Sequence, residues 1–460
     1  MPTIRIAGQY FRTPFVLLFG AELTFGVLSV YLAMTWLQTE AVLGEPWLWS
    51  AGVFGGTMTL SMAAMGLYQS GVWEGVISYL SRLVVALFGA GVILAIISYW
   101  TPTMTIDRTV VATAAGIAIA FITLDRLIFR RLVDSGALAR KIIVLGTGAK
   151  ARTISQIAEQ TKSVEIVWFF PVAGEKFDVD SERIVHQPVK LSDLAEQYGC
   201  EEIVIATGER RNTLPMPELL ACRARGIRVT DENSFVEKET GKISLDLLTP
   251  GWLVGSEGFR YGARARMLRR GFDLVTASLL LVFALPVMAV TALAIFFESG
   301  FSGPILYRQM RVGENGNLFE VLKFRSMRTD AESDGKARWA MTNDARITRV
   351  GKWIRRSRVD ELPQLLNVLK GEMSFVGPRP ERPEFVDELE KVIPFYAERH
   401  CMKPGLTGWA QLRYSYGASQ DDAAQKLQYD LYYIKNHSFL MDLLILVQTA
   451  EVVVFGRGAR

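Results

Sequence analysis

The chain has 460 residues, of which 50% are hydrophobic and 21% are charged, with a mean hydropathy of +0.20 and a formal net charge of +4. This composition excludes a disordered or collagen-like chain, and so small a net charge does not predict binding to nucleic acid. The three cysteines are far apart, which excludes a disulfide scaffold and a cysteine-ligated zinc cluster. We therefore expect two or three domains of a membrane protein with soluble parts.

Four apolar stretches fill the first third of the chain, at residues 14–37, 47–68, 83–100 and 110–129. Each approaches the roughly 20 residues that a helix needs to cross a bilayer, so we predict a four-helix transmembrane region over residues 1–135. Basic residues flank both ends of this region, and the positive-inside rule therefore places both ends in the cytoplasm. Glu22 lies inside the first stretch and is either a functional carboxylate or a neutral packing residue.

Short apolar runs alternate with helical patterns from residue 136 to residue 257. The runs at 142–145, 164–170, 203–206 and 227–229 are typical of the buried strands of a parallel sheet. We predict a Rossmann-like α/β domain here.

A glycine turn, Gly146-Thr147-Gly148, follows the first of these strands and could hold a pyrophosphate at the start of a helix. Phe169 and Phe170 stand where a dinucleotide site needs an acidic residue for the ribose, and this region has no Tyr-x-x-x-Lys pair. We therefore interpret the domain as a degenerate nucleotide-type fold that serves regulation or assembly.

A fifth apolar segment, residues 272–297, is long enough to cross the membrane, but both of its flanks are basic. A single crossing would place one basic flank outside, against the positive-inside rule. Pro286, in the middle, removes a helical hydrogen bond. We expect a re-entrant helix that breaks at Pro286, with a complete kinked span as the alternative.

The C-terminal part of the chain, 258–460, holds most of the candidate chemistry. Asp360 and Glu361 precede an apolar helical run that begins with Leu362-Pro363 and ends near Gly371, so we expect the acidic pair at a helix N-terminus. Phosphoryl transfer needs a positioned nucleophile, cationic clamps and, in most enzymes, Mg²⁺ on a carboxylate. The cations available for such a site are Lys323, Arg325, Arg355, Arg356, Arg358 and Arg379.

Five ordered motifs extend from Arg269 to the C-terminus: Arg269-Arg270-x-x-Asp273, Lys-Phe-Arg-Ser-Met at 323–327, Asp-Glu-Leu-Pro-Gln at 360–364, Gly-Pro-Arg-Pro at 377–380 and Lys-Pro-Gly-Leu-Thr-Gly-Trp at 403–409. With them the chain resembles the bacterial sugar transferases, which load a phosphosugar onto a polyprenyl phosphate. The whole layout looks like the large members of exopolysaccharide clusters, and the stretch 239–259 resembles the subgroup linked to exosortases.

The resemblance implies a mainly helical, membrane-embedded catalytic domain that moves a hexose 1-phosphate from a UDP-sugar to undecaprenyl phosphate. It implies that Asp360 is the nucleophile and Mg²⁺ ligand, that UMP leaves, and that Glu361 assists. Arg379 and Arg355 would bind phosphate, with Lys323 and Arg325 as weaker candidates. Arg269 and Arg270 would meet lipid headgroups, and Pro286 would mark the membrane break. The family expectation is a bacterial inner-membrane enzyme whose catalytic domain faces the cytoplasm.

Leu285 stands where the family usually has the serine of a Ser-Pro pair, which leaves the angle of the break open. The closing segment 439–455 is interrupted by polar residues and is predicted to be an interfacial helix. A membrane-bound sugar-nucleotide dehydratase or epimerase and a non-catalytic assembly scaffold remain as alternatives. The identity of the sugar and the oligomeric state, including a homodimer, stay open.

Overall fold

A computed structural model describes residues 3–6, 9–38, 46–68, 76–101, 107–161, 163–172, 174–186, 189–208, 214–248, 251, 262–331, 344–414, 417 and 419–455. The chain divides into two compact units, Met1–Gly241 and Lys242–Arg460. The domain boundary expected at 257/258 and residues 249–250 and 252–259 of the stretch that resembles the exosortase-linked subgroup lie outside the described residues.

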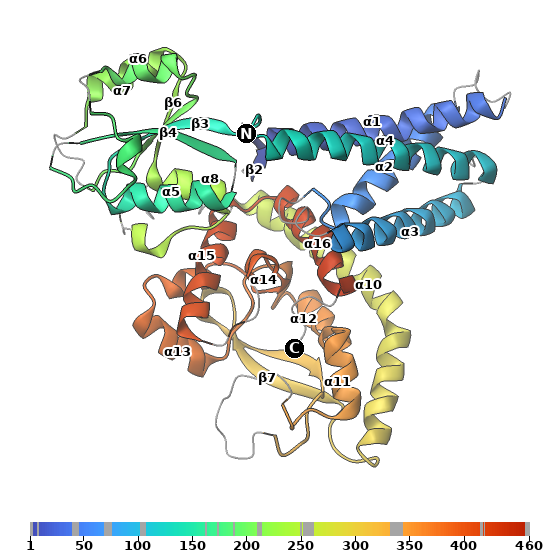
Figure 1. Cartoon of the computed structure of the whole chain (residues 1–460). Coiled ribbons are helices and arrows are strands. Elements are labelled where there is room, and N and C mark those ends of the chain that lie inside the picture. The colour runs from blue at the N-terminus through green and yellow to red at the C-terminus, as the bar shows by residue number, and fades with distance from the viewer. Residues whose placement is uncertain are drawn as a thin grey trace. The chain divides into compact units, whose positions relative to one another are not determined.

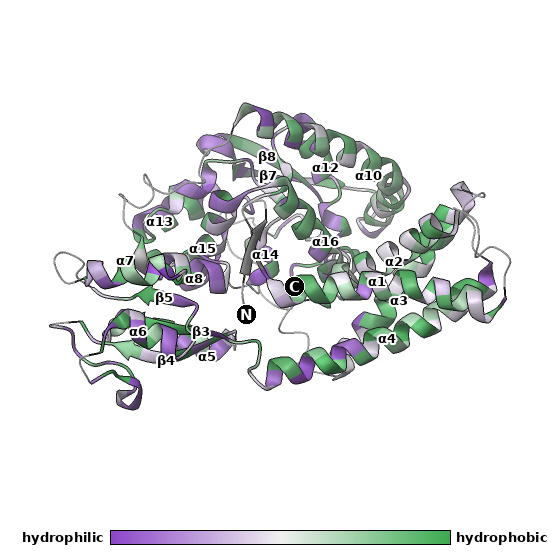
Figure 2. Ribbon diagram, turned by 90° about the horizontal axis from the view of Figure 1, so that it is seen from above, coloured by the Kyte–Doolittle hydropathy of each residue, from purple (hydrophilic) through white to green (hydrophobic). Residues whose placement is uncertain are grey.

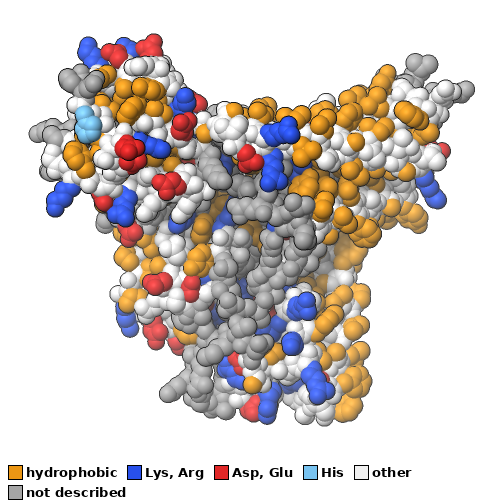
Figure 3. Space-filling view, in the orientation of Figure 1, with side chains coloured by type: hydrophobic (Ala, Val, Ile, Leu, Met, Phe, Trp, Pro, Cys, Tyr) orange, Lys and Arg blue, Asp and Glu red, His pale blue; other side chains and the backbone are white. Residues whose placement is uncertain are grey.

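The first unit begins with an antiparallel hairpin and four helices, drawn in blue to teal in Figure 1. These elements are β1 (Thr3–Ile6), β2 (Gln9–Arg12), α1 (Thr13–Trp36), α2 (Pro46–Ala64), α3 (Val76–Trp100) and α4 (Arg108–Asp134). Apolar residues dominate these helices (Figure 2), and on the face drawn in Figure 3 hydrophobic side chains cover them. A bilayer rather than water suits such a surface.

Four described helices are long and apolar enough to cross a membrane: α1, residues Tyr79–Trp100 of α3, α4, and α10 (Ala263–Glu298) in the second unit. Three of the four expected N-terminal spans are therefore among them. The segment at 47–68 does form a helix, α2, but this helix has only 19 residues and is less apolar, and its crossing stays a prediction.

A buried ion pair joins the first and last of the N-terminal helices. Arg126 of α4 donates from Nε to Oε1 of Glu22 at 2.5 Å and from Nη2 to Oε2 at 2.9 Å, and neither side chain is more than 2% exposed. The Tyr68 hydroxyl also donates to Glu22, and Arg126 donates to the Leu67 carbonyl. The structure thus presents Glu22 as an ionic packing residue that fastens α1 to α4.

The rest of the first unit is an α/β domain. It contains β3 (Arg140–Leu145), α5 (Ala149–Thr161), β4 (Val164–Phe170), a 3₁₀ turn (Ser181–Arg183), α6 (Leu191–Gln197), β5 (Glu202–Ile205), α7 (Met216–Ala224), β6 (Arg228–Asp231) and α8 (Glu232–Thr240). The four strands pair in parallel in the order β4-β3-β5-β6. The predicted parallel sheet and its alternation with helices are confirmed, because each predicted apolar run coincides with one of these strands to within two residues.

The second unit contains a 3₁₀ turn (Leu245–Leu247), the long helix α10, the hairpin β7 (Leu306–Val312) and β8 (Leu318–Phe324), and a set of short helices and strands. These are η6 (Glu314–Gly316), α11 (Arg349–Arg356), η7 (Val359–Glu361), α12 (Gln364–Lys370), β9 (Ser374–Val376), α13 (Pro383–Val392), η8 (Tyr396–His400), β10 (Gly405–Thr407), α14 (Trp409–Arg413), α15 (Gln420–Asn436) and α16 (Phe439–Phe455). One hydrophobic core runs from α10 through β8, α12 and β9 to α15 and α16.

Helix α10 makes polar contacts with the rest of the second unit at two widely separated positions. The carboxylate of Asp273, in its third turn, accepts hydrogen bonds from the Ser374 hydroxyl at 3.0 Å and the Phe375 N–H at 3.1 Å. At the other end, Glu298 accepts from the Val350 N–H of α11 at 3.0 Å. Pro286 lies between these contacts and inside α10, so the helix continues on both sides of the expected break.

Candidate active site

The hairpin β7–β8 and the helix α11 frame the candidate site. Lys323 lies near the end of β8, opposite Tyr307 of β7. The chain then returns close to β8, because the Thr348 N–H donates to the Ser326 carbonyl at 3.1 Å just before α11 begins. A Cβ on Gly351 would stand 2.0 Å from that same carbonyl oxygen, so only glycine permits this approach. The Lys-Phe-Arg-Ser-Met motif is thus packed against α11.

A left-handed residue turns the chain between α11 and the acidic pair. Arg358 has φ 58° and ψ 14°, a conformation that costs a residue with a side chain roughly 1–2 kcal/mol. The turn places Asp360 and Glu361 in the short 3₁₀ turn η7, and α12 begins only at Gln364. The acidic pair therefore stands just before the helix, as expected, but Pro363 and not an acidic residue occupies the cap position of α12.

Three cations surround the Glu361 carboxylate. Arg379 donates from Nη2 to Oε1 at 2.8 Å, Lys323 lies 3.1 Å from the same oxygen, and Arg358 lies 3.7 Å from Oε2. Burial acts to raise the pKa of Glu361, but these positive charges outweigh it and hold the pKa well below its usual range. Burial also lowers the pKa of Lys323, an effect that Glu361 opposes. Glu361 is thus an ionised, fixed counter-charge.

Asp360 is in a different state from its neighbour. Its side chain is only 9% exposed, and no described residue makes a hydrogen bond or ion pair with its carboxylate. Burial raises the pKa of Asp360 to about 6, and the charge of Glu361 adds to the effect. Lys323, Arg355 and Arg358 act in the opposite direction. The result is a carboxylate that is ionised at neutral pH, lies near cations, and is not bonded to any of them.

Asn367 fixes the distance between β8 and α12. Its side chain is fully buried and accepts from the Leu322 N–H at 3.1 Å. Its amide group donates to the Glu320 carbonyl and to the Glu372 carboxylate, each at 2.7 Å. Because Lys323 follows Leu322 directly, this side chain helps to set where Lys323 stands relative to the acidic pair.

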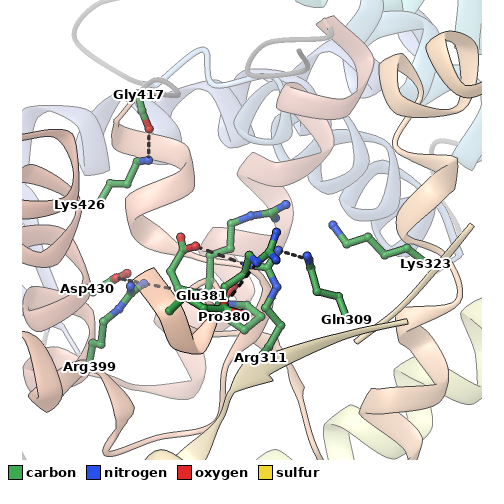
Figure 4. Close-up of polar contacts among 12 residues, drawn as sticks. Gln309, Arg311, Lys323, Pro380, Glu381, Arg399, Gly417, Lys426 and Asp430 are labelled. Atoms are coloured by element: carbon green, nitrogen blue, oxygen red, sulfur yellow. Dashed lines mark hydrogen bonds and ion pairs between the residues drawn. The ribbon is translucent and has the colours of Figure 1, made fainter. Parts of the chain in front are cut away.

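Two arginines hold the segment that carries Arg379, as Figure 4 shows for most of these contacts. Arg399 donates to the Arg379 carbonyl at 3.0 Å and to Asp430 at 2.9 Å, and its side chain is buried. Arg311 donates to the Pro380 carbonyl at 3.1 Å. Both residues act through Arg379, so they are positioning residues that the sequence analysis did not single out.

Glycines explain two of the five motifs. Gly377 and Gly405 touch backbone to backbone, since a Cβ on Gly405 would lie 2.1 Å from the Gly377 nitrogen. The strands β9 and β10 run in parallel beside this contact, and the Gly405 N–H donates to the Pro378 carbonyl at 2.9 Å. The Lys-Pro-Gly-Leu-Thr-Gly-Trp motif thus packs directly against the backbone of the Gly-Pro-Arg-Pro segment and holds it in place.

Three of the predicted cations lie elsewhere or are already bonded. Among the described residues, the guanidinium of Arg325 bonds to neither carboxylate, and its buried Nη1 has no hydrogen-bond partner there. Arg269 donates to the Ser374 hydroxyl and the Val376 carbonyl. Arg270 donates to the Val368 and Leu369 carbonyls, both at 2.6 Å, at the end of α12. Contact of Arg269 and Arg270 with lipid headgroups stays a prediction.

The described residues contain no group of three or more His, Cys, Asp or Glu side chains that could hold a metal ion by themselves. Magnesium is bound in many phosphoryl-transfer sites by one or two carboxylates together with substrate phosphates and water. The unbonded carboxylate of Asp360 fits that requirement, whereas Glu361 is already paired with cations.

Comparison with known proteins decides the family. The bacterial sugar transferase family model matches residues 264–456. An exopolysaccharide production protein of Rhizobium leguminosarum bv. phaseoli is 42% identical over 188 residues, which cover 40% of this chain and 93% of that protein. The chain belongs to the bacterial sugar transferase family.

Two longer relatives also match part of this chain. A UDP-N-acetylgalactosamine-undecaprenyl-phosphate N-acetylgalactosaminephosphotransferase of Aeromonas hydrophila is 41% identical over 245 residues, 53% of this chain and 56% of the relative. A UDP-glucose:undecaprenyl-phosphate glucose-1-phosphate transferase of Escherichia coli K12 is 40% identical over 186 residues, 40% of this chain and 39% of the relative. This sugar transferase thus spans about half or less of the length of these curated relatives.

Proposed function

We propose that this sugar transferase moves a sugar 1-phosphate from a UDP-sugar to undecaprenyl phosphate, as the first membrane step of exopolysaccharide synthesis. Relatives that share its catalytic region carry names with this reaction, with N-acetylgalactosamine or glucose as the sugar. Family membership favours the transferase over the dehydratase, epimerase and scaffold alternatives. The observation that carries the proposal is the contrast between the unbonded Asp360 carboxylate and the firmly paired Glu361.

The proposed reaction has two steps at one phosphorus atom. The Asp360 carboxylate attacks the β-phosphorus of the UDP-sugar, the bond from that phosphorus to the bridging oxygen breaks, and UMP leaves. A phosphate oxygen of undecaprenyl phosphate then attacks the same phosphorus and displaces Asp360, which regenerates the carboxylate and forms the diphosphate-linked sugar. An Asp360 pKa of about 6 keeps the nucleophile ionised at neutral pH.

The cations around the acidic pair support this assignment. Arg355 and Arg379 are half-buried at the end of α11 and in the Gly-Pro-Arg-Pro segment, where guanidinium groups can grip phosphate in a bidentate way. Lys323 neutralises Glu361 and is positioned to face the same phosphates. Asp360 would hold Mg²⁺ together with the substrate phosphates, and the ion would supply charge neutralisation of the diphosphate.

The contacts of α10 support a re-entrant course in the cytoplasmic leaflet. Asp273 and Glu298 are 25 residues apart, about 38 Å along a straight helix, which exceeds a hydrocarbon core of about 30 Å. Yet Asp273 binds β9 and Glu298 binds α11, and both elements belong to the same polar domain as the acidic pair. A helix that returns to the side it entered, with its bend at Pro286, satisfies both contacts.

Labelling in intact bacterial cells tests this topology. Arg266→Cys and Ser302→Cys, each introduced after Cys401→Ser, place one exposed thiol beyond either end of the apolar segment, while Cys200 and Cys222 stay buried. We expect a thiol reagent that does not cross membranes to label both only after the inner membrane is opened. Labelling of one thiol in intact spheroplasts would show a complete crossing instead.

The parallel sheet at 140–231 supports the assignment of the middle domain as Rossmann-like. We propose that this domain regulates or assembles the enzyme, and a homodimer is compatible with that role. We also propose that the chain has three domains, with boundaries at 135/136 and 257/258.

Release of UMP tests the catalytic proposal. Purified enzyme with Mg²⁺ and undecaprenyl phosphate should release UMP from at least one member of a UDP-sugar panel. Asp360→Asn should abolish release, because an amide cannot displace UMP, while Glu320→Gln, which changes an exposed side chain of β8, serves as the folded control. Turnover retained by Asp360→Asn would eliminate Asp360 as the nucleophile.

A further inference from the structure

The α/β domain has a topological switch point, at which the chain direction reverses between two adjacent strands. In the order β4-β3-β5-β6, the chain passes from β3 to β4 on one side and then to β5 on the other. The loops after β3 and β5 therefore diverge at the carboxyl ends of two adjacent parallel strands. In sheets of this kind, ligands bind at that place, and phosphate groups bind to the backbone N–H groups there.

A carboxylate of the chain itself lies at this switch point. The Thr147 N–H, in the loop after β3, donates to Oε2 of Glu175 at 2.9 Å. The Gly208 N–H, in the loop after β5, donates to Oε1 of the same side chain at 3.0 Å. Two backbone donors from separate loops thus converge on one oxyanion, which is the arrangement that binds a phosphate oxygen pair.

The loop after β3 is shaped for an anion. Gly146 has φ +127°, and a Cβ there would lie 2.8 Å from the Ala206 carbonyl oxygen and 3.2 Å from Oε2 of Glu175. The Thr147 hydroxyl is fully buried, and no described residue makes a hydrogen bond with it. Among the described residues, Glu175 accepts from these backbone donors and not from the Thr147 hydroxyl, so one buried polar group at the switch point is left for another ligand.

The segment that carries Glu175, residues 174–178, is largely exposed. The Asp178 N–H donates to the Thr147 carbonyl at 2.8 Å, and Arg152 lies 3.1 Å from the Asp178 carboxylate. Arg152 and Asp178 are 59% and 41% exposed, and an ion pair in water contributes little, about 0–1 kcal/mol. A doubly charged ligand could therefore displace the segment.

We propose that the Thr147 and Gly208 N–H groups at this switch point form a binding site for the phosphate group of a small molecule, and that Glu175 competes with that ligand for them. The apolar end of β4, Phe169-Phe170, offers no acid to a ribose, so the phosphate and not a dinucleotide is the recognised part. The ligand is either free phosphate or pyrophosphate, or the phosphate of a nucleotide. This site is separate from the transfer chemistry and does not depend on Asp360.

Hydrogen–deuterium exchange of the full chain in detergent tests the proposal, because it locates binding away from the catalytic site. The probes are inorganic pyrophosphate, UMP and AMP, each added to the wild-type protein, Glu175→Ala and Glu175→Gln. In Glu175→Ala the Thr147 and Gly208 amides should exchange faster. A probe should restore their protection at about one tenth of the concentration that releases the Glu175 segment in the wild type, which corresponds to about 1.4 kcal/mol.

In the wild type, the same probe should speed exchange at Asp178, because the segment is released. Glu182→Ala, an exposed residue that follows this segment, is the matched control and should behave as the wild type. Protection by pyrophosphate alone identifies the free anion as sufficient, whereas protection by UMP or AMP only identifies a nucleotide. Failure of all three probes to protect the two amides in both Glu175 variants overturns the proposal.

Discussion

Lys323 and Glu361 form a partly buried ion pair, with 3.1 Å between Nζ and Oε1. The two residues come from a hairpin strand and a 3₁₀ turn that are 38 positions apart in the chain. Their pairing leaves the adjacent carboxylate of Asp360 without a bonded cation among the described residues. Glu361 thus keeps the Asp360 carboxylate available, because the nearby cations pair with Glu361 and not with Asp360.

Glu361→Gln should slow UMP release at least tenfold. Lys323, Arg358 and Arg379 lose their counter-charge in this variant. We expect them to pair with the Asp360 carboxylate instead, which makes it a weaker nucleophile. Initial rates at saturating UDP-sugar measure the effect. Glu320→Gln, which removes an exposed carboxylate of β8, should leave the rate within twofold, and an equal loss in both variants would contradict this account.

The pH dependence should report Asp360. With a pKa of about 6, the carboxylate is about 90% ionised at pH 7 and about 10% at pH 5. We expect single-turnover UMP release to rise through an apparent pKa of about 6 and to level off above pH 7. A flat rate between pH 5 and 8 would exclude ionisation of Asp360 as the controlling step.

The same raised pKa predicts a pH-dependent change in stability. The folded state raises the pKa above the ordinary value of 3.8, so protonation favours folding, and this contribution is lost as the pH rises through about 6. Asp360→Asn should therefore raise the thermal unfolding midpoint more at pH 8 than at pH 5. A gain that does not grow with pH would argue against a raised pKa.

Arg399→Lys should disturb the site through Arg379. A lysine cannot keep the contacts with the Arg379 carbonyl, Asp430 and the Tyr396 hydroxyl together. We expect a tenfold or larger rise in KM for the UDP-sugar, because Arg379 is assigned to phosphate binding. Arg308→Lys on the exposed face of the hairpin is the control, and a fall in kcat with unchanged KM would point to a general structural role.

The buried pair in the membrane region should show strong coupling. Glu22→Leu alone leaves Arg126 buried without its counter-charge, at a cost of about 3–5 kcal/mol. Glu22→Leu combined with Arg126→Leu should recover most of that loss. Thermal unfolding of the detergent-solubilised protein measures both, and simple addition of the two single effects would show that the pair does not act as a unit.

Much of the architecture could be predicted from hydrophobic pattern alone. The strand β4 coincides with its predicted range, because short apolar runs between polar segments leave few alternatives. The acidic pair and its cations Lys323 and Arg379 could be predicted through motifs. Arg311 and Arg399 could not, because they bind backbone carbonyls, and such contacts depend on chain geometry and leave no spacing rule in the sequence.

The interior orientation of Arg269 and Arg270 was also beyond a sequence argument. Both stand in a basic cluster before an apolar helix, where the pattern favours lipid contact. In the structure, Arg269 donates a hydrogen bond to Ser374 of β9, and Arg270 donates to the Val368 carbonyl near the end of α12. Charge at a membrane boundary does not by itself tell which partner, lipid or protein, a guanidinium will meet.

A two-stranded hairpin has an outer edge that invites another strand to add. In β8, the Leu322 N–H and the Glu320 carbonyl are both taken by the single side chain of Asn367. The Asn367 amide therefore blocks this part of the strand edge from pairing with a strand of another molecule. Replacing Asn367 with an apolar residue should make the newly synthesised protein more prone to aggregate before it reaches the membrane.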